Sequence, residues 1–358
     1  MDKKILAIIA VIVVILVACG AYFAMGSSGD TVRIGHLQSD HDSALFVAKA
    51  QDQYAKNGIN VQITQFNNGG DLMTAVAAGD IDVGYVGITP AMSSISKGVP
   101  VKVVSGAQTE GSGLVVDKDS NINSVADLKG KTVATPGAAT IQQMLLTDIL
   151  NQNGMDIKDL KVTNLKAAQM VDAIKSNQID AFIIWEPYST IAVQSGEGKL
   201  LMNSSEIESG HPCCCIVATD DFIANHPDEL DTILEIHENA TNYINENPKE
   251  AAELLPDDIV PDRKIQGQIL ENTNFISGLD DEYKQNVKFL LFGILFDQLH
   301  LVPAFRSDFM TGDTFLLHFT HQCPAHLFTV LTASHTLHRN VRFIVICMVE
   351  LLIGGNTV

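Results

Sequence analysis

The feature that most constrains this chain is a pattern that occurs twice. The stretch Met73–Thr89 is echoed by Val171–Pro187, and each copy contains a helix-period segment, an Ile-Asp pair, a short apolar run and a loop. Upstream of each copy the sequence shows a further apolar run, a helical segment and a second apolar run. Both copies therefore read as strand, helix, strand, helix, strand. We expect two α/β units of the same design.

The expected elements lie at matching positions in the two copies. Strands are expected at 32–35, 60–66 and 83–86 with a helix at 44–56, and again at 131–134, 160–165 and 181–184 with a helix at 141–152. A strand joined to a parallel strand by a crossover helix builds an open sheet, and such sheets bind ligands beyond the carboxyl ends of their strands. Two lobes of this kind enclose a cleft.

Composition and charge narrow the class of protein. With 358 residues, 46% of them hydrophobic, the chain can bury two cores. The net charge of −19 and the scarcity of arginine before residue 302 argue against a nucleic-acid partner. The sequence contains no P-loop, no Gly-x-Ser-x-Gly elbow and no His-Glu-x-x-His zinc motif. We therefore expect a binding protein without a cofactor, rather than an enzyme or an ATPase.

The N-terminus indicates export. Lys3 and Lys4 precede the almost purely apolar run 5–25, which places the positive charges on the cytoplasmic side. The run is long enough to span a bilayer, for which roughly 20 residues are needed. Cys19 follows Leu-Val-Ala, which resembles a lipoprotein signal. Either a lipidated Cys19 or the apolar run would tether the chain to the outer face of the cytoplasmic membrane, with residues 26–30 as a linker.

The order of segments predicts how the lobes are connected. We expect residues 31–107 and 215–301 to form one lobe and residues 108–214 the other. The two crossings between them then form a hinge that closes on a ligand. Residues 302–358 differ in composition, with no lysine and five of the 11 histidines. They read as an extension outside the fold or as the product of a shifted reading frame.

Several spaced segments resemble one known family. They are Gly79–Asp82 with Gly84–Gly87, the segment 125–133, Trp185–Tyr188 and His211–Cys214. Over residues 32–301 the chain is similar to the substrate-binding proteins of ABC importers for nitrate, sulfonates, taurine and thiamine-precursor pyrimidines. The resemblance implies a type II periplasmic-binding fold and capture of a small solute by a monomer outside the cell. It also implies delivery to a membrane permease driven by a separate ATPase, and it adds His211 to the candidate site.

The candidate ligand contacts of the first lobe lie in loops that follow strands: His36, Gln38, Ser39, Asp40, His41, Asn68, Gly69, Gly87 and Thr89. The polar loop at 36–41 precedes a helix whose free N-terminal amides can receive an anion. Asp42 or Ser43 at the start of that helix can equally be an ordinary cap. We expect the loops at 67–71 and 87–89 to open on the cleft as well.

The candidates of the second lobe occupy equivalent places: Gly137, Ala138, Thr140, Trp185, Glu186 and Tyr188. Small residues at 137 and 138 let a ligand approach the backbone, and Thr140 supplies a hydroxyl where the helix dipole favours negative charge. An ordinary strand-to-helix turn explains the same residues without a ligand. Trp185, the only tryptophan, is placed to stack on a ligand, although a single tryptophan is more often part of a core.

The charge of the solute stays open at this point. No arginine stands in the candidate loops, so amides, hydroxyls and histidines would have to bind a sulfonate or nitrate. The carboxylates Asp40 and Glu186 would oppose such an anion if they face the cleft. A neutral or cationic heterocycle such as a pyrimidine is the alternative.

Other function classes also remain open. Cys213, Cys214 and Cys215 resemble the cysteine-rich stretch of a pyrimidine-synthesis enzyme with this fold, although Ile216 and Val217 depart from its pattern. A tethered ligand sensor would have the same sequence features as an importer subunit. We expect no metal site at the triplet, because neighbours on a strand point to opposite faces, and we expect small buried strand residues instead.

Overall fold

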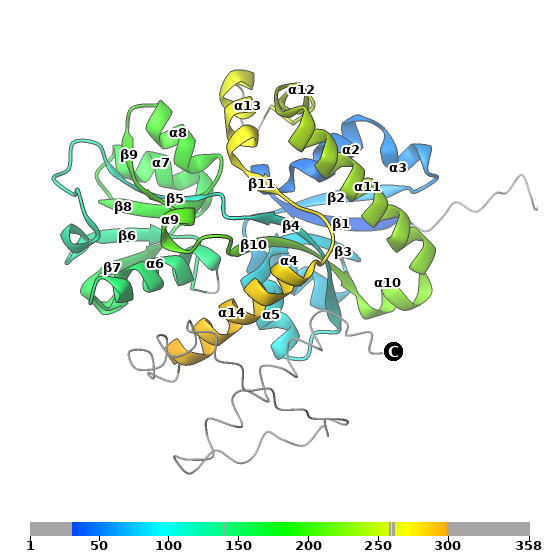
Figure 1. Ribbon diagram of the computed structural model, residues 1–358, viewed down its shortest axis with the longest axis horizontal. Coiled ribbons are helices and arrows are strands. Elements are labelled where there is room, and N and C mark those ends of the chain that lie inside the picture. Colours follow the sequence, from blue (N-terminus) through cyan, green and yellow to red (C-terminus); the bar gives the residue numbers. More distant parts are fainter. Residues whose placement is uncertain (1–30, 139, 258, 260–261, 299–358) are drawn as a thin grey trace, which may run out of the picture.

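The structure consists of two α/β lobes that lie side by side (Figure 1). It is a computed structural model that describes residues 31–298 apart from 139, 258, 260 and 261. The expectations for residues 1–30, Cys19 included, and for residues 299–358 lie outside the described residues. One lobe has a six-stranded sheet with the order β11-β4-β10-β3-β1-β2, and the other a five-stranded sheet with the order β7-β6-β8-β5-β9. The α/β class predicted from the repeat is confirmed.

The first copy of the repeat forms one side of the six-stranded sheet. Its elements are β1 (Val32–Leu37), α2 (Ser43–Ala50), α3 (Gln53–Lys56), β2 (Val61–Phe66), α4 (Gly69–Ala78) and β3 (Val83–Gly87). Strand β1 lies between β2 and β3 and is parallel to both. The chain then continues through α5 (Ile88–Ser96) and β4 (Val101–Thr109).

The second copy repeats this arrangement in the other lobe. Its elements are β6 (Thr132–Thr135), α6 (Ile141–Gln152), β7 (Lys161–Asn164), α7 (Ala167–Lys175) and β8 (Ala181–Trp185). Strand β6 lies between β7 and β8 and is parallel to both. Before and after it come β5 (Ser112–Asp117), α8 (Tyr188–Gln194), β9 (Gly198–Asn203) and α9 (Ser204–Ile207). Strand β5 is antiparallel to β8 and β9.

The repeated Ile-Asp pair makes the same contacts in both lobes. The carboxylate of Asp82 accepts a hydrogen bond from the amide of Arg33 at 2.8 Å, and that of Asp180 accepts one from the amide of Thr132 at 2.8 Å. The amides of the two aspartates donate in return to the carbonyls of the same partners. Each aspartate thereby ties the chain entering the third strand to the start of the first strand.

The chain returns from the second lobe to complete the first. Strand β10 (Pro212–Thr219) inserts between β3 and β4 and is antiparallel to both. The remaining elements are α10 (Asp220–Asn225), α11 (Pro227–Glu246), α12 (Pro248–Ala252), α13 (Arg263–Asn272), β11 (Asn274–Phe275) and α14 (Asp281–Gln298). The chain therefore crosses between the lobes twice, after β4 and before β10.

The single helix expected at 44–56 is wrong, because two helices occupy this stretch. Helix α2 ends at Ala50 and α3 begins at Gln53. Between them Asp52 has a φ of 55°, a left-handed conformation that interrupts a right-handed helix. Aspartate visits this conformation more readily than most residues, since its short polar side chain can bond locally.

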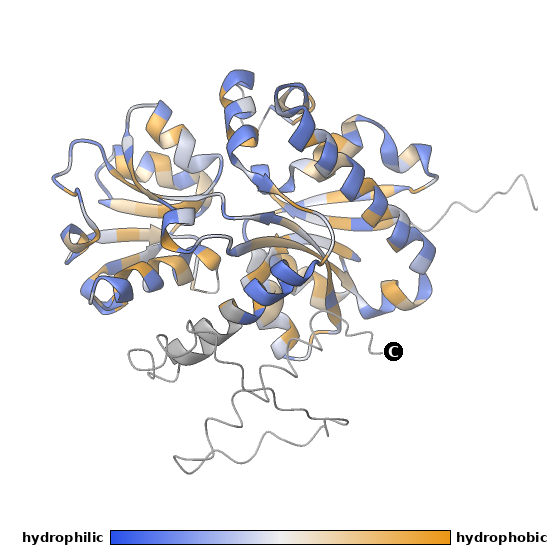
Figure 2. Cartoon of the chain, in the orientation of Figure 1, coloured by the Kyte–Doolittle hydropathy of each residue, from blue (hydrophilic) through white to orange (hydrophobic). Residues whose placement is uncertain are grey.

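Apolar residues run along the strands of both sheets, and the helices carry both apolar and polar residues (Figure 2). All five residues of β8 are buried, as expected of a strand covered by helices on both faces. Within the described residues, no helix combines the length and apolar character that a membrane crossing requires.

Candidate functional site

Loops from the two lobes meet at the carboxyl ends of β1 and β8. The amide of Asp40 and the hydroxyl of Ser39 donate to the carbonyl of Glu186, over 3.3 and 3.4 Å. In the other direction, the indole of Trp185 donates to the carbonyl of Gln38 over 3.4 Å. The structure thus brings the candidate loop of one lobe into contact with that of the other, and we call this contact the interlobe junction.

Aromatic side chains cover one side of the interlobe junction. Trp185 and Tyr188 are 5% and 8% exposed, and the Tyr188 hydroxyl also donates to the carbonyl of Gln38, over 3.5 Å. The Glu186 carboxylate accepts from the amide and the hydroxyl of Thr190, at 3.1 and 3.0 Å. These side chains are therefore held in place by bonds to both lobes.

The carbonyl of Gly111 contacts residues of both lobes. Gly111 lies in the first crossing, and its oxygen lies 2.9 Å from Nε2 of His41 and accepts from the amide of Glu186 at 3.0 Å. Gly111 has a φ of 74°, and a Cβ there would lie 2.4 Å from Nε2 of Gln108 and 2.7 Å from Nε2 of His41. Conformation and space both require glycine at this position.

The interlobe junction is acidic and buried. Asp42 accepts a hydrogen bond from the amide of Leu37 at 2.8 Å, and Asp40 accepts one from the side chain of Gln266 on α13. Burial raises the pKa of Asp40 and of Asp42 to about 7, although these hydrogen bonds act in the opposite direction. Among the described residues, Oδ2 of Asp40 and Oε1 of Gln266 have no hydrogen-bond partner. The junction therefore holds two buried oxygens whose hydrogen-bonding capacity is not used by the described residues.

A cavity of about 710 Å³ adjoins the interlobe junction. Its walls come from α8 and β9 of one lobe and from α13 of the other, and Gly111 and Glu186 also line it. Ser189 on this wall is 2% exposed, and its hydroxyl has no partner in the part of the chain that the structure describes. The size of the cavity suits a small molecule.

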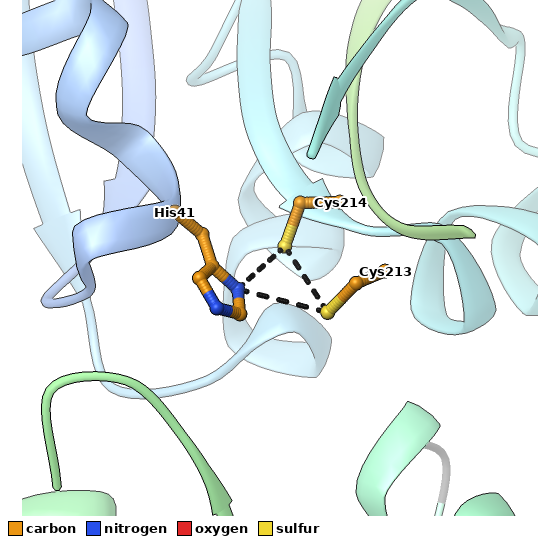
Figure 3. A group of neighbouring side chains, drawn as sticks. All are labelled: His41, Cys213 and Cys214. Atoms are coloured by element: carbon orange, nitrogen blue, oxygen red, sulfur yellow. Dashed lines mark hydrogen bonds between the residues drawn. The ribbon is translucent and has the colours of Figure 1, made fainter. Parts of the chain in front are cut away.

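His41 also faces two cysteines of β10 (Figure 3). Its Nδ1 lies 3.3 Å from Sγ of Cys214 and 3.6 Å from Sγ of Cys213, and the two sulfurs are 3.8 Å apart. The prediction that adjacent cysteines here point to opposite faces is wrong. Between Pro212 and Cys214 the strand has one residue more than β4 opposite it, and this bulge turns both sulfurs to one side. The predicted burial of the triplet within a strand is confirmed.

Three first-lobe candidates, Gly69, Gly87 and Thr89, lie close to Pro90. A Cβ added to Gly69 would lie 2.6 Å from Cγ of Pro90, and one added to Gly87 would lie 3.4 Å from its Cδ. Thr89, next in sequence, is 7% exposed, and its hydroxyl is unpartnered within the described residues. The Cβ added to Gly87 would also lie 3.7 Å from the carbonyl of Cys213, so this group adjoins the cysteine bulge.

Two further first-lobe candidates have local partners. Asn68 caps α4 by accepting from the amide of Asp71 at 2.9 Å. The ring of His36 packs edge-on against Phe46, with centroids 4.9 Å apart, and its Nδ1 lies 2.7 Å from the carbonyl of Leu37. Capping and ring packing account for both geometries.

The turn before α6 matches the capping alternative. The hydroxyl of Thr140 donates to the carbonyl of Gly137 at 2.7 Å and accepts from the amide of Gln143 at 3.4 Å, while Ala138 is exposed. These bonds do not reach the interlobe junction. His211 lies in the second crossing with Nδ1 2.6 Å from the carbonyl of Glu208, and burial lowers the pKa of its ring.

Sequence reasoning missed Gly111 and Gln266. Gln266 contacts Asp40 from a helix 226 positions later, and no local pattern marks that pairing. Gly111 follows Glu110 between two apolar strands, so a turn signal was present.

Comparisons with known proteins find relatives that cover more than half of the chain. The model of the NMT1-like family matches residues 26–256. A putative aliphatic sulfonates-binding protein of Bacillus subtilis is 30% identical over 282 residues, which cover 76% of this chain and 83% of the relative. A 4-amino-5-hydroxymethyl-2-methylpyrimidine phosphate synthase of Schizosaccharomyces pombe is 25% identical over 210 residues, covering 55% of this chain and 60% of the synthase.

A solved structure shows the same fold. The alkanesulfonate-binding protein SsuA of Xanthomonas axonopodis pv. citri, bound to MOPS, matches with a TM-score of 0.66 at 20% identity, covering 78% of this chain and 96% of that one. At this identity the likeness concerns the fold alone. The two-lobed periplasmic-binding fold implied by the resemblance is confirmed.

Proposed function

The chain belongs to the NMT1-like family, and on this premise we propose that it captures a small solute between its lobes outside the cytoplasm. It then passes the solute to an ABC permease driven by a separate ATPase. The interlobe junction carries this proposal, because polar loops at the carboxyl ends of β1 and β8 meet there beside a cavity. The apolar run 5–25 behind Lys3 and Lys4 supports export and a tether at the membrane.

We propose further that the solute is neutral or cationic and carries hydrogen-bond donors, as an aminopyrimidine does. The unpartnered oxygens of Asp40 and Gln266 are fully buried in this conformation, and opening of the hinge would let them accept from such donors. Both arginines of the described chain are engaged elsewhere, Arg33 with Asp82 and Arg263 with Asp257. An anion placed beside Asp40 would lack a guanidinium partner and face a buried carboxyl group.

A sulfonate is the second candidate solute, favoured by the names of the Bacillus subtilis relative and of the Xanthomonas protein. A thermal-shift screen of the full-length chain separates the two classes. A ligand at 100 times its Kd stabilises the folded chain by about 2.7 kcal/mol. We expect aminopyrimidines to raise the melting temperature and taurine, other sulfonates and nitrate to leave it unchanged.

Thr140→Val tests whether an oxyanion binds at the start of α6, away from the interlobe junction. It removes the hydroxyl at the start of α6, where an oxyanion would gain most from the helix dipole. An aminopyrimidine should bind this variant as it binds the unchanged chain. If a sulfonate stabilises the unchanged chain but not Thr140→Val, the proposed solute class is wrong, while the proposed transport role still holds. No stabilisation by either class would contradict solute capture.

Trp185→Ala is expected to weaken solute affinity roughly 10- to 100-fold, since an aromatic contact and a hydrogen bond together contribute about 1–3 kcal/mol. Trp185→Phe keeps a ring and loses only the N–H, so its loss should be smaller. Calorimetric titration measures both affinities, and circular dichroism melting confirms that each variant folds. Unchanged affinity in Trp185→Ala would place the residue outside the site.

Two other functions give different readouts. The Schizosaccharomyces pombe synthase and the cysteine triplet favour a pyrimidine-synthesis enzyme, which would release product on incubation with its substrates, whereas a binding protein saturates without product. A tethered sensor would bind the same solute. A permease gene beside that of this chain would identify the importer subunit.

A further inference from the structure

We propose that His41, Cys213 and Cys214 form a metal site that holds Zn²⁺ beside the interlobe junction. In the part of the chain that the structure describes, these are the three ligand-type side chains whose donor atoms all lie within 4.8 Å of one another. All three are buried. The short 3-10 helix Asp40–Asp42 after β1 supplies the histidine, and the bulge of β10 supplies both cysteines (Figure 3).

The spacing of the three donor atoms matches a tetrahedral zinc ion. With Zn–S bonds of about 2.3 Å and Zn–N bonds of about 2.0–2.1 Å, tetrahedral angles place two sulfurs about 3.8 Å apart and nitrogen about 3.5 Å from each sulfur. The structure has 3.8 Å between the sulfurs of Cys213 and Cys214, and 3.3 and 3.6 Å from them to Nδ1 of His41. One ion therefore reaches all three atoms without rearrangement of the backbone.

The other nitrogen of His41 has the partner that a metal-bound imidazole requires. Nε2 lies 2.9 Å from the carbonyl of Gly111, which can only accept, so Nε2 carries the proton. Nδ1 then presents its lone pair to the two sulfurs. Metal-bound histidines nearly always donate their second N–H to a carbonyl or a carboxylate, which fixes the ring.

Charge favours Zn²⁺ over a monovalent soft metal. Two thiolates and a neutral imidazole bring two negative charges, and a divalent cation cancels them. A buried Cu⁺ would leave one negative charge uncompensated in a site that already adjoins Asp42. Without a metal, the single lone pair of Nδ1 can accept a proton from only one of the two thiols.

Three protein ligands leave one position of a tetrahedral ion open. Structural zinc sites close with four protein ligands, whereas an open position takes water or another small molecule. A polar atom of the captured solute at this position would couple metal and solute binding. That coupling rests on the proposed function, but the metal site itself does not.

The test uses the full-length chain, stripped of metal and with its thiols reduced. We expect it to bind Zn²⁺ at His41, Cys213 and Cys214 and to melt at a higher temperature with Zn²⁺ present. Co²⁺ in the same site should give a thiolate-to-cobalt charge-transfer band. Cys213→Ala and Cys214→Ala should each weaken zinc binding by more than the roughly 100-fold that loss of an outer-shell partner costs.

Cys215→Ala is the matched control. Its sulfur is equally buried in the same strand but lies outside the group, so zinc should stabilise this variant as it stabilises the unchanged chain. Cys323→Ala, in the histidine-rich segment 302–358, should also leave the zinc effect intact. Equal zinc affinity in Cys213→Ala and the unchanged chain would overturn the proposal. So would a missing charge-transfer band, or a Cys213–Cys214 disulfide that persists under the reducing conditions of the assay.

Discussion

Replacement of Gly111 by alanine is expected to lower the free energy of unfolding by about 4–5 kcal/mol, since three costs combine. An L-residue pays about 1–2 kcal/mol for the left-handed conformation. The new Cβ displaces Nε2 of Gln108, which donates to the carbonyls of Thr109 and Glu110. It also displaces His41 from the Gly111 carbonyl. Each lost hydrogen bond adds about 1 kcal/mol.

Gly154→Ala isolates the backbone part of this effect. Gly154 has a φ of 69°, and a Cβ there meets nothing within 4 Å. Its replacement should cost only the roughly 1–2 kcal/mol of the left-handed conformation. Denaturant titration of the full-length chain, followed by the fluorescence of Trp185, measures both variants. Equal losses would show that the contacts of Gly111 with Gln108 and His41 contribute nothing to stability.

Acid is expected to destabilise the fold by about 3 kcal/mol through His237 alone. This side chain is 1% exposed, with Nε2 3.1 Å from the carbonyl of Gly106 and Nδ1 3.4 Å from the hydroxyl of Tyr85. Burial lowers its pKa from 6.5 to about 4. The folded chain therefore binds this proton less readily than the unfolded chain. Its contribution is fully present above pH 6.5 and is lost as the pH falls from 6.5 towards 4.

His237→Gln tests this assignment, because a neutral amide can still donate to the Gly106 carbonyl and does not titrate. The difference in unfolding free energy between the two chains is measured at pH 7 and at pH 4. The subtraction matters, since the raised pKa values of Asp40 and Asp42 act in the opposite direction in both chains. A difference that stays constant between pH 7 and pH 4 would refute the role of His237.

The repeat predicted the architecture because it consists of features that determine local structure. Apolar runs, helix periods and the Ile-Asp pair are short-range features, and helix α6 occupies the predicted residues 141–152. The contacts of Asp82 and Asp180 explain why that pair recurs. No glycine or proline marks the break at Asp52, so the helix-period pattern gave no signal of the left-handed conformation there.

The candidate site was less accessible to sequence reasoning. The loops around Asp40 and Trp185 were identified because they follow strands, and the structure brings them together. The contact between Asp40 and Gln266 depends on how a helix that is distant in the sequence packs. The shared direction of Cys213 and Cys214 depends on a bulge, and a bulge is set by pairing with another strand rather than by the cysteines themselves.

The place of β10 also fixes when each half of the protein can be finished during synthesis. All strands of the five-stranded sheet come from the continuous stretch 112–203, so that sheet can assemble as soon as the ribosome has released it. The other sheet begins at Val32 but has no strand between β3 and β4 until Thr219 has emerged. At about 5–20 residues per second, β4 waits roughly 5–20 s for that neighbour. The lobe that contains the N-terminal strand is therefore the last of the two to be completed during synthesis.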